Sequence, residues 1–128
     1  MVPSKRQSIL IIDDNQQRKM ALSSRLRMQG YTIDIATGGF HSIHLIEKNH
    51  YNLVLIIDDM EDMAAHETIG LIRACKSSSA TPVIVLRSSG QELENDVLNI
   101  INRESPAVVA PWQDEFRSVL RQINSHIA

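Results

Sequence analysis

The chain alternates between short apolar runs and longer stretches in which apolar residues recur with helical spacing. Continuous apolar runs are typical of strands buried on both faces of a sheet, and here they fall at residues 8–13, 53–57 and 82–86. Residues 31–36 alternate between apolar and polar, which predicts an edge strand with one wetter face. A short run at 107–109 predicts a fifth strand.

Between these runs, apolar residues recur every three or four positions, which predicts amphipathic helices. The first helix carries Leu22 and Leu26, and Gly30 follows where a C-terminal glycine would end it. The stripes of the later helices are Ile43 and Ile46; Ile69 and Ile72; Leu93, Val97, Ile100 and Ile101; and Phe116, Val119, Leu120, Ile123 and Ile127.

A strand followed by a helix, repeated five times, predicts a parallel sheet covered by helices on both faces. Right-handed crossovers leave few topologies for such a chain. We therefore expect one α/β domain over residues 1–128, a flavodoxin-like (βα)5 three-layer sandwich whose five-stranded sheet has the order 2-1-3-4-5. Any functional site in this architecture lies beyond the carboxyl ends of the strands.

Composition narrows the class of protein. Thirteen basic against fifteen acidic residues give a formal net charge of −2, which argues against a broad nucleic-acid-binding surface. The single cysteine, Cys75, can form no internal disulfide, and no apolar run approaches the roughly 18 residues of a membrane span. We expect a cytoplasmic protein that does not bind membranes.

Several motifs, in this order, resemble the receiver domains of bacterial two-component response regulators. They are the acidic pair that ends the first strand (Asp13 and Asp14), the loop with Met60 and Met63, the fourth strand 81–86, and the pair Pro111 and Trp112. In that family an aspartate at the end of the third strand accepts a phosphoryl group, and the acidic pair holds Mg²⁺. A Thr or Ser and a Lys contact the phosphoryl group, because cations must neutralise the charge that gathers during transfer.

The chain departs from that pattern at several matching positions. Ile57 occupies the acceptor position, Arg87 the Thr or Ser position, and Ala110 the Lys position. Ala107 replaces the aromatic residue that usually moves in the family's switch. The resemblance therefore implies a vestigial phosphorylation pocket built from Asp13, Asp14, Ile57, Arg87 and Ala110.

Asp58 offers an alternative, because shifting the alignment by one residue would make it (or Asp59) the phospho-acceptor. Successive strand side chains point to opposite faces, however, so a neighbour of the acceptor position points away from the pocket. Asp13, Asp14 and Asp59 are the weaker alternative of a Mg²⁺ site, since hard cations favour carboxylates. Against this alternative, we expect the Arg87 guanidinium to pair with Asp13 or Asp14 and to repel a cation, so no cofactor and no metal are expected.

The favoured function is an atypical receiver, or pseudo-receiver, that is not an enzyme and has no catalytic residue. It would act in signal transduction by contacting a signalling protein, its own output domain or a second copy of itself, through a face that includes Leu98, Ala107 and Trp112. The alternatives are a phosphoacceptor receiver using Asp58, or a flavodoxin-like small-ligand-binding protein. The last would need a phosphate-binding loop after the first strand, where this chain has the acidic residues Asp13 and Asp14. The resemblance raises a cis bond between Ala110 and Pro111, as in the family, but the sequence leaves open whether this bond is cis or trans.

Overall fold

A computed structural model describes residues 7–58, 60–87, 99, 107–111 and 116–127, with only the backbone given for residues 107–111. Its sheet has the order β2-β1-β3-β4-β5, and all four neighbouring pairs are parallel. The strands are β1 (Ser8–Ile12), β2 (Thr32–Ala36), β3 (Leu53–Ile57), β4 (Val83–Arg87) and β5 (Ala107–Pro111). The predicted strand order is confirmed, and the strand bounds differ from the predicted ones by at most two residues.

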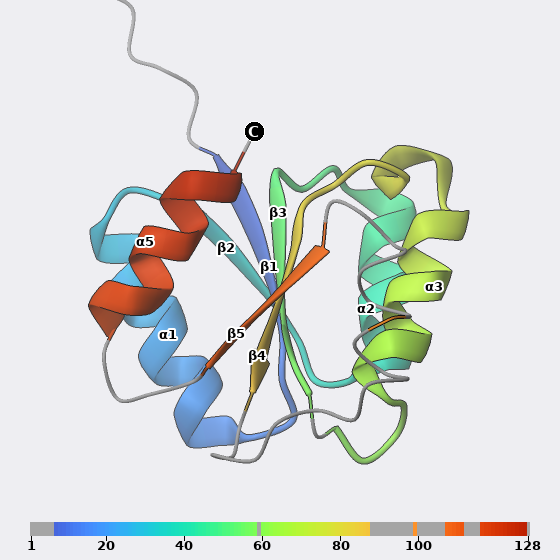
Figure 1. Ribbon diagram of the computed structural model, residues 1–128, viewed down its shortest axis with the longest axis horizontal. Coiled ribbons are helices and arrows are strands. Elements are labelled where there is room, and N and C mark those ends of the chain that lie inside the picture. Colours follow the sequence, from blue (N-terminus) through green and yellow to red (C-terminus); the bar gives the residue numbers. More distant parts are fainter. Residues whose placement is uncertain (1–6, 59, 88–98, 100–106, 112–115, 128) are drawn as a thin grey trace, which may run out of the picture.

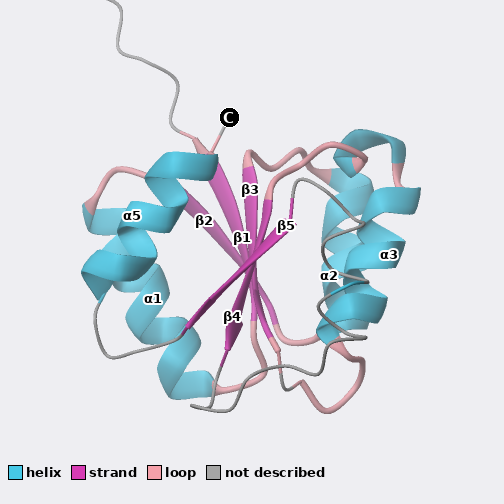
Figure 2. Cartoon of the chain, in the orientation of Figure 1, coloured by secondary structure: helices cyan, strands magenta, loops and turns pink. Residues whose placement is uncertain are grey.

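Helices cover both faces of the sheet, with α1 and α5 on one side and α2 and α3 on the other (Figures 1 and 2). Their bounds are α1 (Gln16–Met28), α2 (Gly39–Lys48), α3 (Ala65–Ala74) and α5 (Phe116–His126), with a short 3-10 helix at Lys76–Ser78. The helix predicted over the stripe 93–101 lies outside the described residues, apart from residue 99, which is helical.

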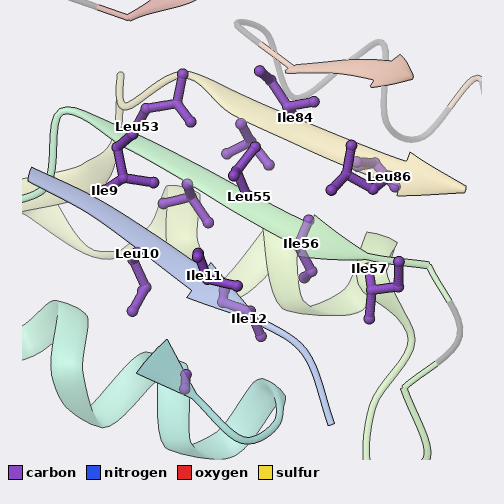
Figure 3. Close-up of a cluster of buried hydrophobic side chains, with 14 of the residues drawn as sticks. Ile9, Leu10, Ile11, Ile12, Leu53, Leu55, Ile56, Ile57, Ile84 and Leu86 are labelled. Carbon is purple, nitrogen blue, oxygen red and sulfur yellow. The ribbon is translucent and has the colours of Figure 1, made fainter. Parts of the chain in front are cut away.

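The strands form the centre of the core. All five side chains of β3 are buried, and so are the last four of β1 and the first four of β4, because helices cover the sheet on both faces. Figure 3 shows these side chains as carbon-only branches packed on β1, β3 and β4. The edge strand β2 alternates instead, with Ile33 buried and Asp34 exposed.

The predicted apolar stripes of the described helices face this core. Leu22, Leu26, Ile46, Ile69 and Ile72 are each at most 1% exposed. The first helix ends as predicted, because Gly30 adopts φ +97° and its N–H donates to the Arg27 carbonyl at 3.0 Å.

A buried phenol joins the start of β3 to the edge strand. Tyr51 is 4% exposed, and its hydroxyl donates to Oδ2 of Asp34 at 2.7 Å. Burial, together with this hydrogen bond and the charge of the carboxylate, raises the pKa of Tyr51 well above its usual value.

Candidate functional site at the carboxyl edge of the sheet

The acidic pair and Ile57 meet at the carboxyl edge of the two central strands. Ile12, the last residue of β1, is in register with Ile56 of β3. Asp13, the first residue after β1, is therefore level with Ile57, the last residue of β3. Because parallel neighbours in register point to the same face, Asp13 and Ile57 lie side by side on one face of the sheet. Each is only 2% exposed.

Both carboxylate oxygens of Asp13 accept hydrogen bonds from within the chain. The Arg18 guanidinium donates twice, from Nε to Oδ2 at 2.6 Å and from Nη2 to Oδ1 at 2.8 Å. The backbone N–H of Asn15 also donates to Oδ1, at 2.8 Å. Such a two-pronged arginine–carboxylate pair is the strongest common form of ion pair, and here the side chains of Arg18 and Asp13 are only 14% and 3% exposed.

The start of α1 brings Arg18 to this position. Asn15 is the N-cap residue, and its Oδ1 accepts from the Arg18 backbone N–H at 2.9 Å. The first turn of α1 contains no acidic residue, so the partner of Arg18 comes from the strand that precedes the helix. A cation in the first turn of a helix opposes the helix dipole, and its pairing with Asp13 offsets that cost.

Ile57 and Asp58 are turned to opposite sides at the end of β3. Ile57 is in register with Leu86 of β4, and the Asp58 N–H still donates to the Leu86 carbonyl at 3.0 Å. This bond closes the Ile57–Leu86 pair, which is the last pair of β3 with β4. Because side chains alternate along an extended chain, the Asp58 side chain, one residue after Ile57, is expected on the face opposite Ile57 and Asp13. Asp58 is half-buried, and Figure 3 shows Ile57 at the tip of β3.

The second acidic residue ties two loops together. Oδ2 of Asp14 accepts from the Glu61 backbone N–H at 2.9 Å, which links the loop after β1 to the loop after β3. Asp14, Asn15, Arg18 and Glu61 line a pocket of about 350 Å3. The residues that line the pocket therefore include one arginine and two acidic residues.

Asp62, in the loop after β3, caps the start of α2. Its Oδ1 and Oδ2 accept from the backbone N–H groups of Gly39 and Phe40, at 3.1 and 3.2 Å. The helix thereby receives a side-chain cap that its own Gly38 cannot supply. A Cβ on Gly38 would lie 2.6 Å from Oδ2 of Asp62, so this close approach requires glycine.

The other site residues predicted from sequence are placed only by register or are not described. Arg87 is the half-buried last residue of β4, in register with Pro111, while Ala110 is in register with Leu86 and Ala107 with Val83. The pairing of Arg87 with Asp13 or Asp14 stays a prediction. Asp59, Leu98 and Trp112 lie outside the described residues.

Sequence reasoning missed Arg18 and Asp62. An arginine in the first turn of a helix, five residues after a strand-ending aspartate, was the available signal for the first. A helix that begins Gly38-Gly39 without a capping side chain was the signal for the second. Both contacts join segments across a loop or between loops, and sequence spacing alone does not identify such pairs.

The donor set does not form a ready cation site in the part of the chain that the structure describes. No group of three His, Cys, Asp or Glu side chains lies close enough there to hold a metal ion. A cation at Asp13 would have to displace the Arg18 guanidinium from both oxygens. The described helices also differ from a membrane span in length and apolar character, and none of them is long and apolar enough to cross a membrane.

Comparison with protein families matches residues 9–109 to the response regulator receiver domain. Among curated proteins, the chain is 30% identical over 89 residues to the sensor protein EvgS of Escherichia coli, covering 70% of this chain and 7% of EvgS. It is 27% identical over 119 residues to the E. coli transcriptional regulatory protein CpxR, covering 89% of this chain and 49% of CpxR. The chain thus spans about half of CpxR and a small part of EvgS.

Solved structures share the fold at lower identity. The chemotaxis protein CheY4 of Vibrio cholerae superposes with a TM-score of 0.87 at 15% identity, covering 96% of this chain and all of that one. The receiver domain of sensor histidine kinase PA1611 from Pseudomonas aeruginosa, which has a magnesium ion in its active-site cleft, gives a TM-score of 0.76 at 22% identity, covering 93% of this chain and 94% of that one.

Proposed function

The chain belongs to the response regulator receiver domain family, and we propose that within this family it signals without phosphorylation, as a pseudo-receiver. Its output would be contact with protein partners: a signalling protein, an output domain of the same protein or a second copy of the chain. It is not an enzyme in this proposal, and it acts in the cytoplasm. Neither membrane nor nucleic acid is its target.

The observation that carries the proposal is the place of Ile57 beside Asp13. A phosphoryl group needs an oxygen nucleophile at the strand end that lies next to the acidic pair, and this side chain contributes only carbon. Ile57 is 2% exposed and continues the apolar core to the tip of β3. A pocket for an anionic ligand would have to open at a position that is filled by packed hydrocarbon.

The ion pair between Arg18 and Asp13 supports the same proposal from the side of the cation. Phosphoryl transfer to a carboxylate depends on a divalent ion that can approach both the acidic pair and the phosphoryl oxygens. Here a tethered monovalent group occupies both oxygens of Asp13. Mg²⁺ is therefore not part of the proposed mechanism.

The alternative is a phosphoacceptor that uses Asp58 or Asp59. Asp58 is half-buried and directly follows β3, but the alternation of side chains along the strand turns it away from the face of Asp13. Without a face shared with Asp13, Asp58 would not use a cation held there.

Exposure to acetyl phosphate and Mg²⁺, followed by intact mass measurement, tests the proposal. We expect no phosphate-sized mass gain, while a receiver with aspartate at the end of its third strand gains it under the same conditions. A gain that disappears in Asp58→Asn or Asp59→Asn would establish the alternative and defeat the proposal.

A further inference from the structure

The charges of this chain are unevenly distributed over its layers. Helices α1 and α5 hold six of the thirteen basic residues and no acidic residue. The rest of the chain holds the other seven basic residues against all fifteen acidic ones, a formal charge of −8. The net charge of −2 therefore conceals a basic helical layer, which composition alone did not reveal.

Four of the six basic side chains in this layer are exposed, and all four are arginines: Arg25, Arg27, Arg117 and Arg121. The Arg27 guanidinium donates to the Ile33 carbonyl of the edge strand β2 at 3.3 Å, so we call Arg25, Arg117 and Arg121 the arginine face. The other two basic side chains of the layer turn inward, since Arg18 pairs with Asp13 and Lys19 is 7% exposed. Asp114 and Glu115, which precede α5 in sequence, lie outside the described residues.

Two contacts join α1 and α5 into one surface. The Arg25 guanidinium lies 5.5 Å from the centre of the Phe116 ring, at the start of α5. The Tyr31 hydroxyl, just after α1, donates to Oδ1 of Asn124 near the end of α5 at 2.9 Å. Figure 1 shows the two helices together on one side of the sheet. The arginines of both helices can therefore face a single partner.

Large apolar side chains are exposed on the same layer. Met28, at the end of α1, is 85% exposed, and Met20, two turns earlier, is 46% exposed. Arginine and methionine are both enriched at protein–protein interfaces, whereas lysine is depleted there. A face of arginines with exposed methionines is thus typical of a surface that binds protein.

Charge separates two classes of anionic partner. A guanidinium binds a carboxylate with two parallel hydrogen bonds, so an acidic protein surface matches this face. A long nucleic acid would extend beyond it and meet the other layers, which carry the excess of carboxylates, and its binding depends on many phosphate contacts. A compact acidic patch meets the arginine face alone.

We propose that the arginine face of α1 and α5 is a docking surface for an acidic surface of a partner protein. The inference rests on the proposed function in one respect, that protein contact is the output of this domain. It adds which layer makes the contact and which chemistry the partner presents.

Titration of the isotopically labelled protein with poly-L-glutamate at low ionic strength tests this proposal. We expect amide shifts concentrated in α1 and α5, and a dissociation constant that rises at least tenfold in the double variant Arg117→Glu, Arg121→Glu. The matched control, Lys48→Glu with Lys76→Glu, changes the net charge equally at exposed positions of α2 and the 3-10 helix, and we expect a change of less than twofold. A parallel titration with a random-sequence DNA duplex should show weaker binding.

Equal weakening by both double variants, shifts outside α1 and α5, no binding of polyglutamate, or tighter binding of the duplex would each overturn the proposal. Amide spectra of the variants establish that they remain folded before binding is compared. The acetyl phosphate experiment is independent of this one. A mass gain there would defeat the pseudo-receiver proposal and leave the polyglutamate result standing.

Discussion

The Arg18 guanidinium donates to both oxygens of the Asp13 carboxylate, at 2.6 and 2.8 Å. Asp13 is the first residue of the acidic pair that follows β1. Asp13 is 2% exposed, so its carboxylate oxygens take their hydrogen bonds from this partner and from the Asn15 N–H and not from bulk water. An unpaired buried carboxylate costs far more than the pair contributes, which makes Arg18 the residue whose loss is most informative.

Replacement Arg18→Ala should lower the free energy of unfolding by about 3 kcal/mol, because it leaves the Asp13 charge buried without its cation. Urea denaturation measures this. Arg117→Ala, which removes an exposed arginine, is the matched control and should change stability by less than about 0.5 kcal/mol. In the double variant Arg18→Ala, Asp13→Asn, much of the loss should return, since the buried charge is gone. Additive losses would show that the pair is not coupled.

The same substitution should expose a cation site that the guanidinium occupies. We expect Arg18→Ala to bind Mg²⁺ at least tenfold more tightly than the parent chain, because both oxygens of Asp13 then become available beside Asp14. Calorimetric titration of both proteins measures the difference, and Arg18→Ala with Asp14→Asn should lose the gain. If the parent chain already binds Mg²⁺ as tightly as Arg18→Ala, the guanidinium does not exclude the ion.

Two helical glycines should respond oppositely to alanine. A Cβ on Gly39 would lie 2.7 Å from Oγ1 of Thr68 and 2.9 Å from Cβ of Met63, whereas a Cβ on Gly70 meets nothing within 4 Å. We expect Gly39→Ala to destabilise by about 1–3 kcal/mol through overpacking. Gly70→Ala, in the exposed interior of α3, should stabilise by about 0.5–1 kcal/mol through helix propensity. Thermal denaturation of both variants measures this contrast, and effects of the same sign would contradict it.

Tyr51 should make the fold sensitive to alkali. Its pKa is raised in the folded chain, chiefly by burial and then by Asp34, so above about pH 10, the ordinary value for tyrosine, the unfolded state loses the proton first. The stability contributed by the neutral phenol is complete below that pH and declines as pH rises above it.

Urea midpoints at pH 7 to 11 measure this dependence. Tyr51→Phe should flatten the alkaline decline, while Tyr31→Phe, which removes a different inter-element phenol bonded to Asn124, should keep it. The same slope in both variants would exclude Tyr51 as its source.

The strand order and the main core residues followed from sequence because apolar periodicity is set locally. The run 53–57 could be assigned to a central strand since all five of its side chains are apolar, and the alternation at 31–36 marked the sheet edge. Ile57 was placed at the carboxyl edge by counting from that strand. Its position level with Asp13 then follows from the register of Ile12 with Ile56.

The partner of Asp13 could not be predicted in the same way. Sequence reasoning assigned the guanidinium of Arg87 to the acidic pair because the carboxyl ends of parallel strands meet at one edge. In the structure, Asp13 forms an ion pair with Arg18. The position of Arg18 depends on the direction in which α1 begins after its N-cap, Asn15. That direction is a property of the folded loop, and periodicity carries no information about it.

The hydrogen bonds of Glu61 and Asp62 have a consequence for how this end of the domain fluctuates. The backbone N–H of Glu61 donates to the Asp14 carboxylate in the loop after β1. The Asp62 carboxylate accepts from the Gly39 and Phe40 N–H groups at the start of α2. Detaching any one of the three segments sacrifices bonds in another, so their amides should exchange with solvent in concert, as one cooperative opening unit. Two adjacent residues, Glu61 and Asp62, thereby couple the local opening of segments that lie nearly fifty positions apart in the chain.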